Sequence, residues 1–130
     1  MTQEEKDLLL KDLCARLPYQ VVCIDTNINV VGTLSQIGMH YDMCTLDIDK
    51  GDSESCYIPN CKPYLFPLSS MTEEQKEEYV SLQQRVIYNS QGLVNLDVMK
   101  YVDWCYKHHI DINSLIPIGL ANDATGLNIY

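Results

Sequence analysis

Basic residues are scarce in this chain of 130 residues, in which nine Lys and Arg stand against 18 Asp and Glu for a formal net charge of −9. A protein that binds nucleic acid directly needs a clustered basic surface to neutralise the phosphates, and no segment of this sequence carries net positive charge. We therefore expect no direct nucleic-acid binding. An acidic surface favours instead a protein partner that carries basic residues.

Long apolar runs are also missing. No stretch approaches the ~18 apolar residues of a membrane-spanning helix, and the opening sequence MTQEEKD lacks the positive charge before an apolar run that marks a signal peptide. We therefore expect a cytoplasmic protein that does not contact membranes. Because the cytosol keeps thiols reduced, we expect free thiols at all six cysteines, which are Cys14, Cys23, Cys44, Cys56, Cys61 and Cys105.

Glycine is scarce as well, and with it the common phosphate-binding loops. The six glycines are scattered, and neither Gly-x-Ser-x-Gly nor His-Glu-x-x-His occurs. A nucleophilic enzyme would need a Ser or Cys with a positioned base, for which the sequence offers no pattern. We expect a non-enzymatic protein and assign no catalytic residue.

Two patterns suggest a metal site, and neither has the required spacing. The acidic stretch 47–54 resembles half of a calcium loop, but Asp52 and Ile58 stand where an EF-hand has Gly and Glu. Thiols and imidazoles also occur close together without a recognised zinc-ligand spacing, as Cys56 with Cys61 and as Cys105 with His108 and His109. We expect no metal and no cofactor, and we assign the cysteines of strand-like runs to core packing.

Residues 2–17 are predicted to form a helix. Thr2 followed by Glu5 has the spacing of a capping box. A leucine at every fourth position from Leu9 gives the helix one apolar stripe, and Pro18 ends it.

Residues 18–59 are predicted to form a meander of four short antiparallel strands. β-Branched runs, period-two alternation and polar turns between them place the strands at 21–24, 28–37, 41–48 and 56–58. A flat sheet of this size leaves exposed edges. We therefore expect the meander to bend strongly and close as a small SH3-like barrel.

Residues 60–70 are predicted to be an extended strap, because two prolines remove backbone donors there. The residues between the prolines are too apolar for a free linker. We favour a strap that closes one end of the barrel, with Tyr64 and Phe66 facing it and Leu65 pointing away. The alternative is that the same two rings are exposed anchors of an interface.

Residues 71–130 are predicted to be helical, with two to three helices placed at 72–88, 95–109 and 111–121. Thr72 with Gln75 repeats the capping-box spacing. One apolar face is expected on the second of these helices, made of Leu96, Met99, Val102, Cys105 and His109. The sequence thus predicts a single α+β domain over residues 1–130.

The run KPYLFPLSSMTEEQ at residues 62–75 resembles a signature of small uncharacterised proteins of gut Bacteroidetes and their phages or prophages. Residues 7–19 and 108–130 are similar to the start and end of those proteins, although Pro117 stands where their last helix has Glu or Lys. The resemblance implies a mobile-element context. It supplies no known activity and no site residue.

These observations favour a non-enzymatic accessory module of a phage or prophage that binds a protein partner, with Tyr64 and Phe66 as candidate anchors. The alternative is a small-ligand binder that sequesters a nucleotide signal at a homo-oligomer interface, with counter-defence as its use. Such a site needs basic side chains around a pocket, and the scarce candidates are Arg16, Lys62 and Arg85.

Overall fold

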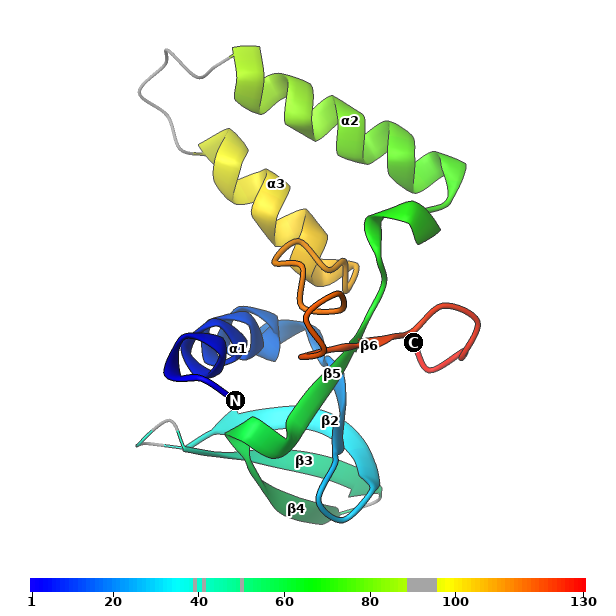
Figure 1. Cartoon of the computed structure of the whole chain (residues 1–130). Coiled ribbons are helices and arrows are strands. Elements are labelled where there is room, and N and C mark those ends of the chain that lie inside the picture. Colours follow the sequence, from blue (N-terminus) through cyan, green and yellow to red (C-terminus); the bar gives the residue numbers. More distant parts are fainter. Residues whose placement is uncertain (39, 41, 50, 89–95) are drawn as a thin grey trace.

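The computed structural model describes all residues except 39, 41, 50 and 89–95. The described residues form an α+β domain of an N-terminal helix, a six-stranded sheet and two further helices (Figure 1). The predicted start of the helix 95–109, at residue 95, lies outside the described residues.

The first helix, α1 (Gln3–Arg16), begins with the predicted capping box. The Thr2 hydroxyl accepts a hydrogen bond from the Glu5 amide at 3.1 Å, and the Glu5 carboxylate accepts one from the Thr2 amide at 3.3 Å. Both bonds satisfy amides that the start of a helix otherwise leaves unpaired. The helix ends in a 3₁₀ turn that contains Pro18, after which Gln20 adopts the left-handed conformation with φ 57°.

The sheet has the order β4-β3-β2-β1-β5-β6, and every pair of neighbours is antiparallel except β5 with β6. Its strands are β1 (Val22–Asp25), β2 (Val30–Ile37), β3 (Met43–Asp49), β4 (Asp52–Tyr57), β5 (Cys61–Leu65) and β6 (Asn122–Asp123). The predicted meander is thus present as β1 to β4, with β4 longer than expected.

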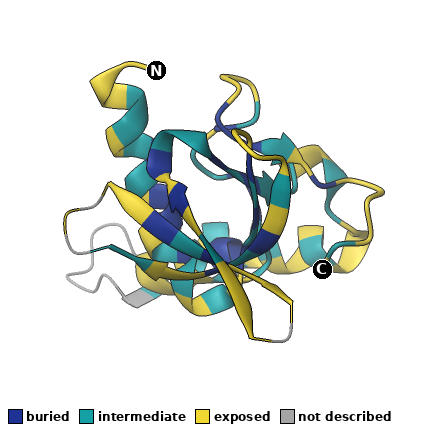
Figure 2. Cartoon of the chain, turned by 90° about the horizontal axis from the view of Figure 1, so that it is seen from below, coloured by how far each residue is buried: buried dark blue, intermediate teal, exposed yellow. Residues whose placement is uncertain are grey.

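The sheet is strongly curved, with its buried residues on the inner side (Figure 2). Two features of β2 allow the bend. The register of β2 against β3 shifts between Leu34 and Gln36. Gly32 also lies so close to β3 that a Cβ atom at this position would be 2.8 Å from the Asp47 carbonyl oxygen. The described strands do not close into a ring, because β4 and β6 remain the two edges. The expected SH3-like barrel is therefore not confirmed.

The segment 60–70 differs from the predicted strap. It contains strand β5, which follows a 3₁₀ turn (Ile58–Asn60) and lies between β1 and β6, and a second 3₁₀ turn (Leu68–Ser70). Burial alternates along β5, so that Leu65 is fully buried while Tyr64 is half-buried on the opposite face. Phe66 is also only half-buried. The expectation that the two rings face the core and that Leu65 points away is therefore wrong.

The helices α2 (Glu73–Tyr88) and α3 (Leu96–Lys107) pack side by side and project away from the sheet (Figure 1). Tyr79 and Tyr101 join them by a hydrogen bond of 3.0 Å between their hydroxyl groups, and the Trp104 indole donates to the Glu78 carboxylate at 2.8 Å. None of the described helices is long and apolar enough to span a membrane.

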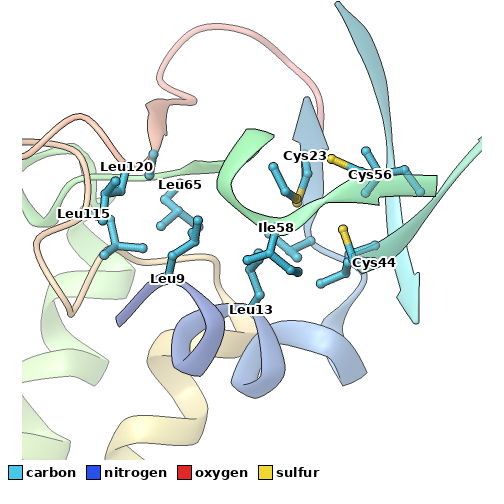
Figure 3. Packing of buried hydrophobic residues seen from close by; sticks show 14 residues of the cluster. Leu9, Leu13, Cys23, Cys44, Cys56, Ile58, Leu65, Leu115 and Leu120 are labelled. Atoms are coloured by element: carbon cyan, nitrogen blue, oxygen red, sulfur yellow. The ribbon is translucent and has the colours of Figure 1, made fainter. Parts of the chain in front are cut away.

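The predicted third helix at 111–121 is replaced by turns. The Asp111 carboxylate accepts hydrogen bonds from the amides of Leu115 and Ile116 at 2.8 and 2.9 Å, which stabilises a turn rather than a continuing helix. Leu115 and Leu120 then enter the core beside Leu65 and the helix α1 (Figure 3).

Candidate functional site

Arg16 is fully buried and ties α1 to the segment that follows α3. Its guanidinium donates to both carboxylate oxygens of Asp12, at 2.7 and 3.1 Å, and to the Ile110 carbonyl oxygen at 2.7 Å. It also lies 4.9 Å from the centre of the Tyr106 ring. These contacts hold the side chain inside the fold, where it cannot reach a ligand at the surface.

The other two basic candidates lie on elements apart from Arg16. Lys62 is half-buried on β5, opposite Ile24 of β1, while Arg85 is exposed on α2 in a shallow depression with Trp104 of α3. The structure therefore does not bring the three cationic side chains together. A pocket built from them for a nucleotide signal has no support in the geometry.

Phe66, Tyr130 and His109 form a small aromatic clasp, which Tyr64 joins through its backbone carbonyl group. The Tyr130 ring lies 5.7 Å from that of Phe66 and stacks on His109 at 3.7 Å between ring centres. The Tyr130 hydroxyl accepts a hydrogen bond from the Val22 amide at 2.9 Å and donates to the Tyr64 carbonyl at 2.6 Å. The clasp therefore fastens the C-terminal segment to β1 and β5.

Burial in this clasp changes the titration of its members. The pKa of His109 is lowered to about 4, mainly because burial disfavours the charged imidazole, and the positive charge of Arg16 and the neighbouring His108 lower it further. Burial of the Tyr130 hydroxyl likewise raises the pKa of that phenol. His109 was predicted to share the buried face of α3, but it follows the helix in the left-handed conformation, with φ 59°.

An apolar groove along α3, bordered by Ala15 of α1, is a feature that the sequence did not predict. It has a volume of about 640 Å³ and is lined by Ala15, Val98, Met99, Lys100, Val102, Asp103 and Tyr106. Two of its apolar side chains are largely exposed to solvent, with Met99 64 % exposed and Val98 43 % exposed. The Tyr19 hydroxyl donates to the Asp103 carboxylate, which links the end of α1 to α3 beside the groove.

The groove arises because α3 has two apolar sides. Tyr101 and Trp104 contact α2, whereas Val98, Val102 and Tyr106 follow one another at intervals of four residues along the groove. The sequence pattern of α3 predicted one buried stripe. It could not show that α2 covers only one side of the helix.

A cluster of buried thiols lies inside the curved sheet. The sulfur atoms of Cys44 (β3), Cys56 (β4) and Cys61 (β5) all lie within 4.8 Å of one another. Cys44 and Cys56 are directly opposite in the β3–β4 pair, and Cys23 of β1 pairs with Pro63, two residues from Cys61 on β5. Figure 3 shows Cys23, Cys44 and Cys56 gathered beside Ile58.

The environment of these thiols favours their protonated form. The hydrogen bond with Cys56 lowers the pKa of Cys44, but the hydrogen bond with Cys61 and burial raise it by more, to about 12. The contact with Cys23 is the largest cause that raises the pKa of Cys61, and burial adds to it. A cysteine nucleophile needs a lowered pKa and access to solvent, and the cluster has neither.

Comparisons with protein-family models, with curated proteins and with solved structures found no match to this chain. The groove and the thiol cluster are therefore interpreted from their geometry alone.

Proposed function

We propose that this chain is a non-enzymatic binding module that holds an amphipathic helix of a protein partner in the groove along α3. The observation that carries the proposal is the uncovered apolar side of α3, where Val98 and Met99 are exposed although the opposite side of the helix is packed against α2. Of the described residues outside α3, only Ala15 of α1 lines the groove, and it leaves Val98 and Met99 exposed. Exposed apolar side chains that gather in a groove between helices are typical of a helix-binding site.

The spacing within the groove fits a helical partner. Val98 and Val102 lie four residues apart on the groove, in the kind of row that packs into the groove of a second helix, and the buried Tyr106 ring closes one end of that row. The 12 residues of α3 span about 18 Å, the length of a partner helix of about three turns. Met99 adds an adaptable side chain of the kind that binding grooves often use.

The charge of the chain indicates which residues surround the partner's apolar stripe. The formal net charge is −9, and the groove itself carries one acidic and one basic side chain, Asp103 and Lys100. A partner helix with Lys or Arg beside its apolar stripe is therefore attracted to this protein by its net charge. The resemblance of residues 62–75 supports the wider proposal that the module is a cytoplasmic accessory protein of a phage or prophage.

The shape of the sheet supports a small barrel of the SH3-like kind as the frame of this module. The strands β1 to β4 form a strongly curved antiparallel meander, and the next strand, β5, returns to pair with β1. In this proposal the barrel carries α1 on one side, and α1 provides one wall of the groove.

Site-specific photo-crosslinking in host cells tests the proposal. A photoreactive residue at Met99 is compared with one at Val80, which is 47 % exposed on α2 and lies outside the groove. We expect Met99 alone to crosslink a partner, at a segment of that partner that is an amphipathic helix with basic residues. We also expect Met99→Glu to abolish the complex without changing the melting temperature, and Val80→Glu to leave it intact.

Three outcomes would contradict the proposal. Equal crosslinking from both positions would show that the groove is not the site. Retention of the complex by Met99→Glu would show the same. Crosslinking only to a second copy of this chain would identify the groove as a homo-oligomer interface instead.

A further inference from the structure

We infer that Cys23, Cys44, Cys56 and Cys61 form a structural binding site for one zinc ion inside the curved sheet. The sequence predicted no metal, because these cysteines lack a recognised ligand spacing in the chain. Strand pairing brings three of the sulfur atoms within 4.8 Å of one another, although they are not spaced as zinc ligands along the chain. The inference is independent of the partner-binding groove.

The distances suit a metal ion better than a disulfide. Four sulfur ligands at about 2.3 Å from a tetrahedral zinc are about 3.8 Å apart. The thiols of Cys44, Cys56 and Cys61 therefore need to move by no more than about 1 Å to coordinate the ion. A disulfide would join two sulfur atoms at about 2 Å and leave the third without a role. Three thiols within 4.8 Å of one another can provide three of the four ligands of such an ion.

Cys23 is the fourth donor in this inference. It is fully buried on the neighbouring strand β1, where it pairs with Pro63, two residues from Cys61, although its sulfur lies outside the group of three that are all within 4.8 Å of one another. The buried Asp25, which pairs with Cys61 across the two strands, is the competing donor, but its carboxylate already accepts a hydrogen bond from the Asn27 amide at 2.9 Å. Thiolates are soft ligands that select zinc over magnesium or calcium. On binding, each thiol loses its proton to solvent as its sulfur–zinc bond forms, with no change in oxidation state.

The position of the cluster gives the ion a structural role. In the described sheet β4 and β5 are not neighbours, so no backbone ladder joins them across the opening of the curve. Cys44 and Cys56 come from one side of this opening, whereas Cys23 and Cys61 come from the other. An ion held by all four would link the two sides, which the strand hydrogen bonds leave open. Structural zinc sites stabilise small domains in this way.

Native mass spectrometry of protein refolded with zinc under reducing conditions tests the inference. We expect one zinc per chain for the wild type and for two control variants, Cys14→Ser and Cys105→Ser, whose cysteines lie outside the cluster. We expect zinc affinity to fall at least tenfold in Cys61→Ser and in Cys23→Ser, and to be retained in Asp25→Asn. A chelator should lower the melting temperature of the wild type.

A second measurement keeps the inference testable if the cluster variants fail to fold. Cobalt(II) added to metal-free wild-type protein should give the intense thiolate-to-cobalt charge-transfer absorption of a tetrahedral site, and zinc should displace it. The inference is overturned by any of four results. These are no bound metal after refolding with zinc, full affinity in Cys61→Ser, loss of affinity in Asp25→Asn but not in Cys23→Ser, and a Cys44–Cys56 disulfide in protein isolated from the cytosol under alkylating conditions.

Discussion

The orientation of β5 makes Leu65 the residue whose truncation should destabilise the fold most in the segment 60–70. Its side chain is fully buried, in a core cluster that includes Leu9 of α1 and Leu115 of the segment after α3. Leu65→Ala removes these contacts and leaves a cavity, which costs about 2–5 kcal/mol of unfolding free energy in well-packed cores. Phe66→Ala should cost less, about 1–2 kcal/mol, because the ring is half-buried and packs mainly on Tyr130.

The expected loss is large enough to measure by thermal unfolding. The unfolding entropy of a chain of 130 residues is about 0.27 kcal/mol per degree near the melting temperature. A loss of about 2–5 kcal/mol therefore lowers the melting temperature by about 7–18 °C.

The same substitution three residues later serves as the matched control. Leu68 is 43 % exposed, so Leu68→Ala should change the unfolding free energy by no more than ~0.5 kcal/mol, or about 2 °C. Calorimetry of the three variants checks the ordering. A larger loss for Phe66→Ala than for Leu65→Ala, or a Leu65→Ala variant that melts with the control, would refute the assigned orientation of β5.

Three other variants test the remaining contacts. Asp12→Ala leaves the charge of Arg16 buried without its partner and should cost about 3–5 kcal/mol in urea unfolding, whereas replacing both residues by Leu and Met should cost much less. The folded protein keeps His109 neutral down to a pKa of about 4 while the unfolded chain is protonated below about pH 6.5, so stability is lost as pH falls between these values. His109→Asn, which tolerates the left-handed conformation, should flatten the melting temperature over that range. Tyr130→Phe removes two hydrogen bonds to the backbone, and amide exchange at Val22 should become faster while stability falls by about 1–2 kcal/mol.

The elements that sequence reasoning predicted correctly are those with local signals. The start of α1 depends on Thr2 and Glu5, which lie one turn apart, and the capping box forms as expected. The alternation in β3 likewise places Cys44 and Leu46 in the core. In both cases the deciding residues lie within a few positions of one another, so no knowledge of the tertiary fold is needed.

The prolines of the segment 60–70 predict an unpaired strap, whereas the structure has a paired strand there. Pro63 lies within β5, where it faces Cys23 of β1. On the other side of the strand, the ladder to β6 involves only Tyr64 and Leu65. The missing amide of Pro63 is therefore not needed by that neighbour, and the strand tolerates it as an edge strand does. The partner strand β6 lies near the C-terminus and has only two residues, so no local pattern could reveal it.

The four cysteines of the thiol cluster depend on tertiary geometry to different degrees. Cys44 and Cys56 each lie six residues from position 50, inside a stretch whose turn residues predicted a hairpin. The sequence predicted a polar turn between the strands 41–48 and 56–58 but no register, and the observed register is what places Cys44 opposite Cys56. Cys61 joins the pair only because a 3₁₀ turn carries the chain across the opening of the sheet into β5, and Cys23 only because β5 then pairs with β1. Spacing rules for zinc sites describe ligands that lie on one hairpin or knuckle. Ligands that come from four strands have no such spacing in the sequence. Such a site could be predicted only from the register in which the strands pair.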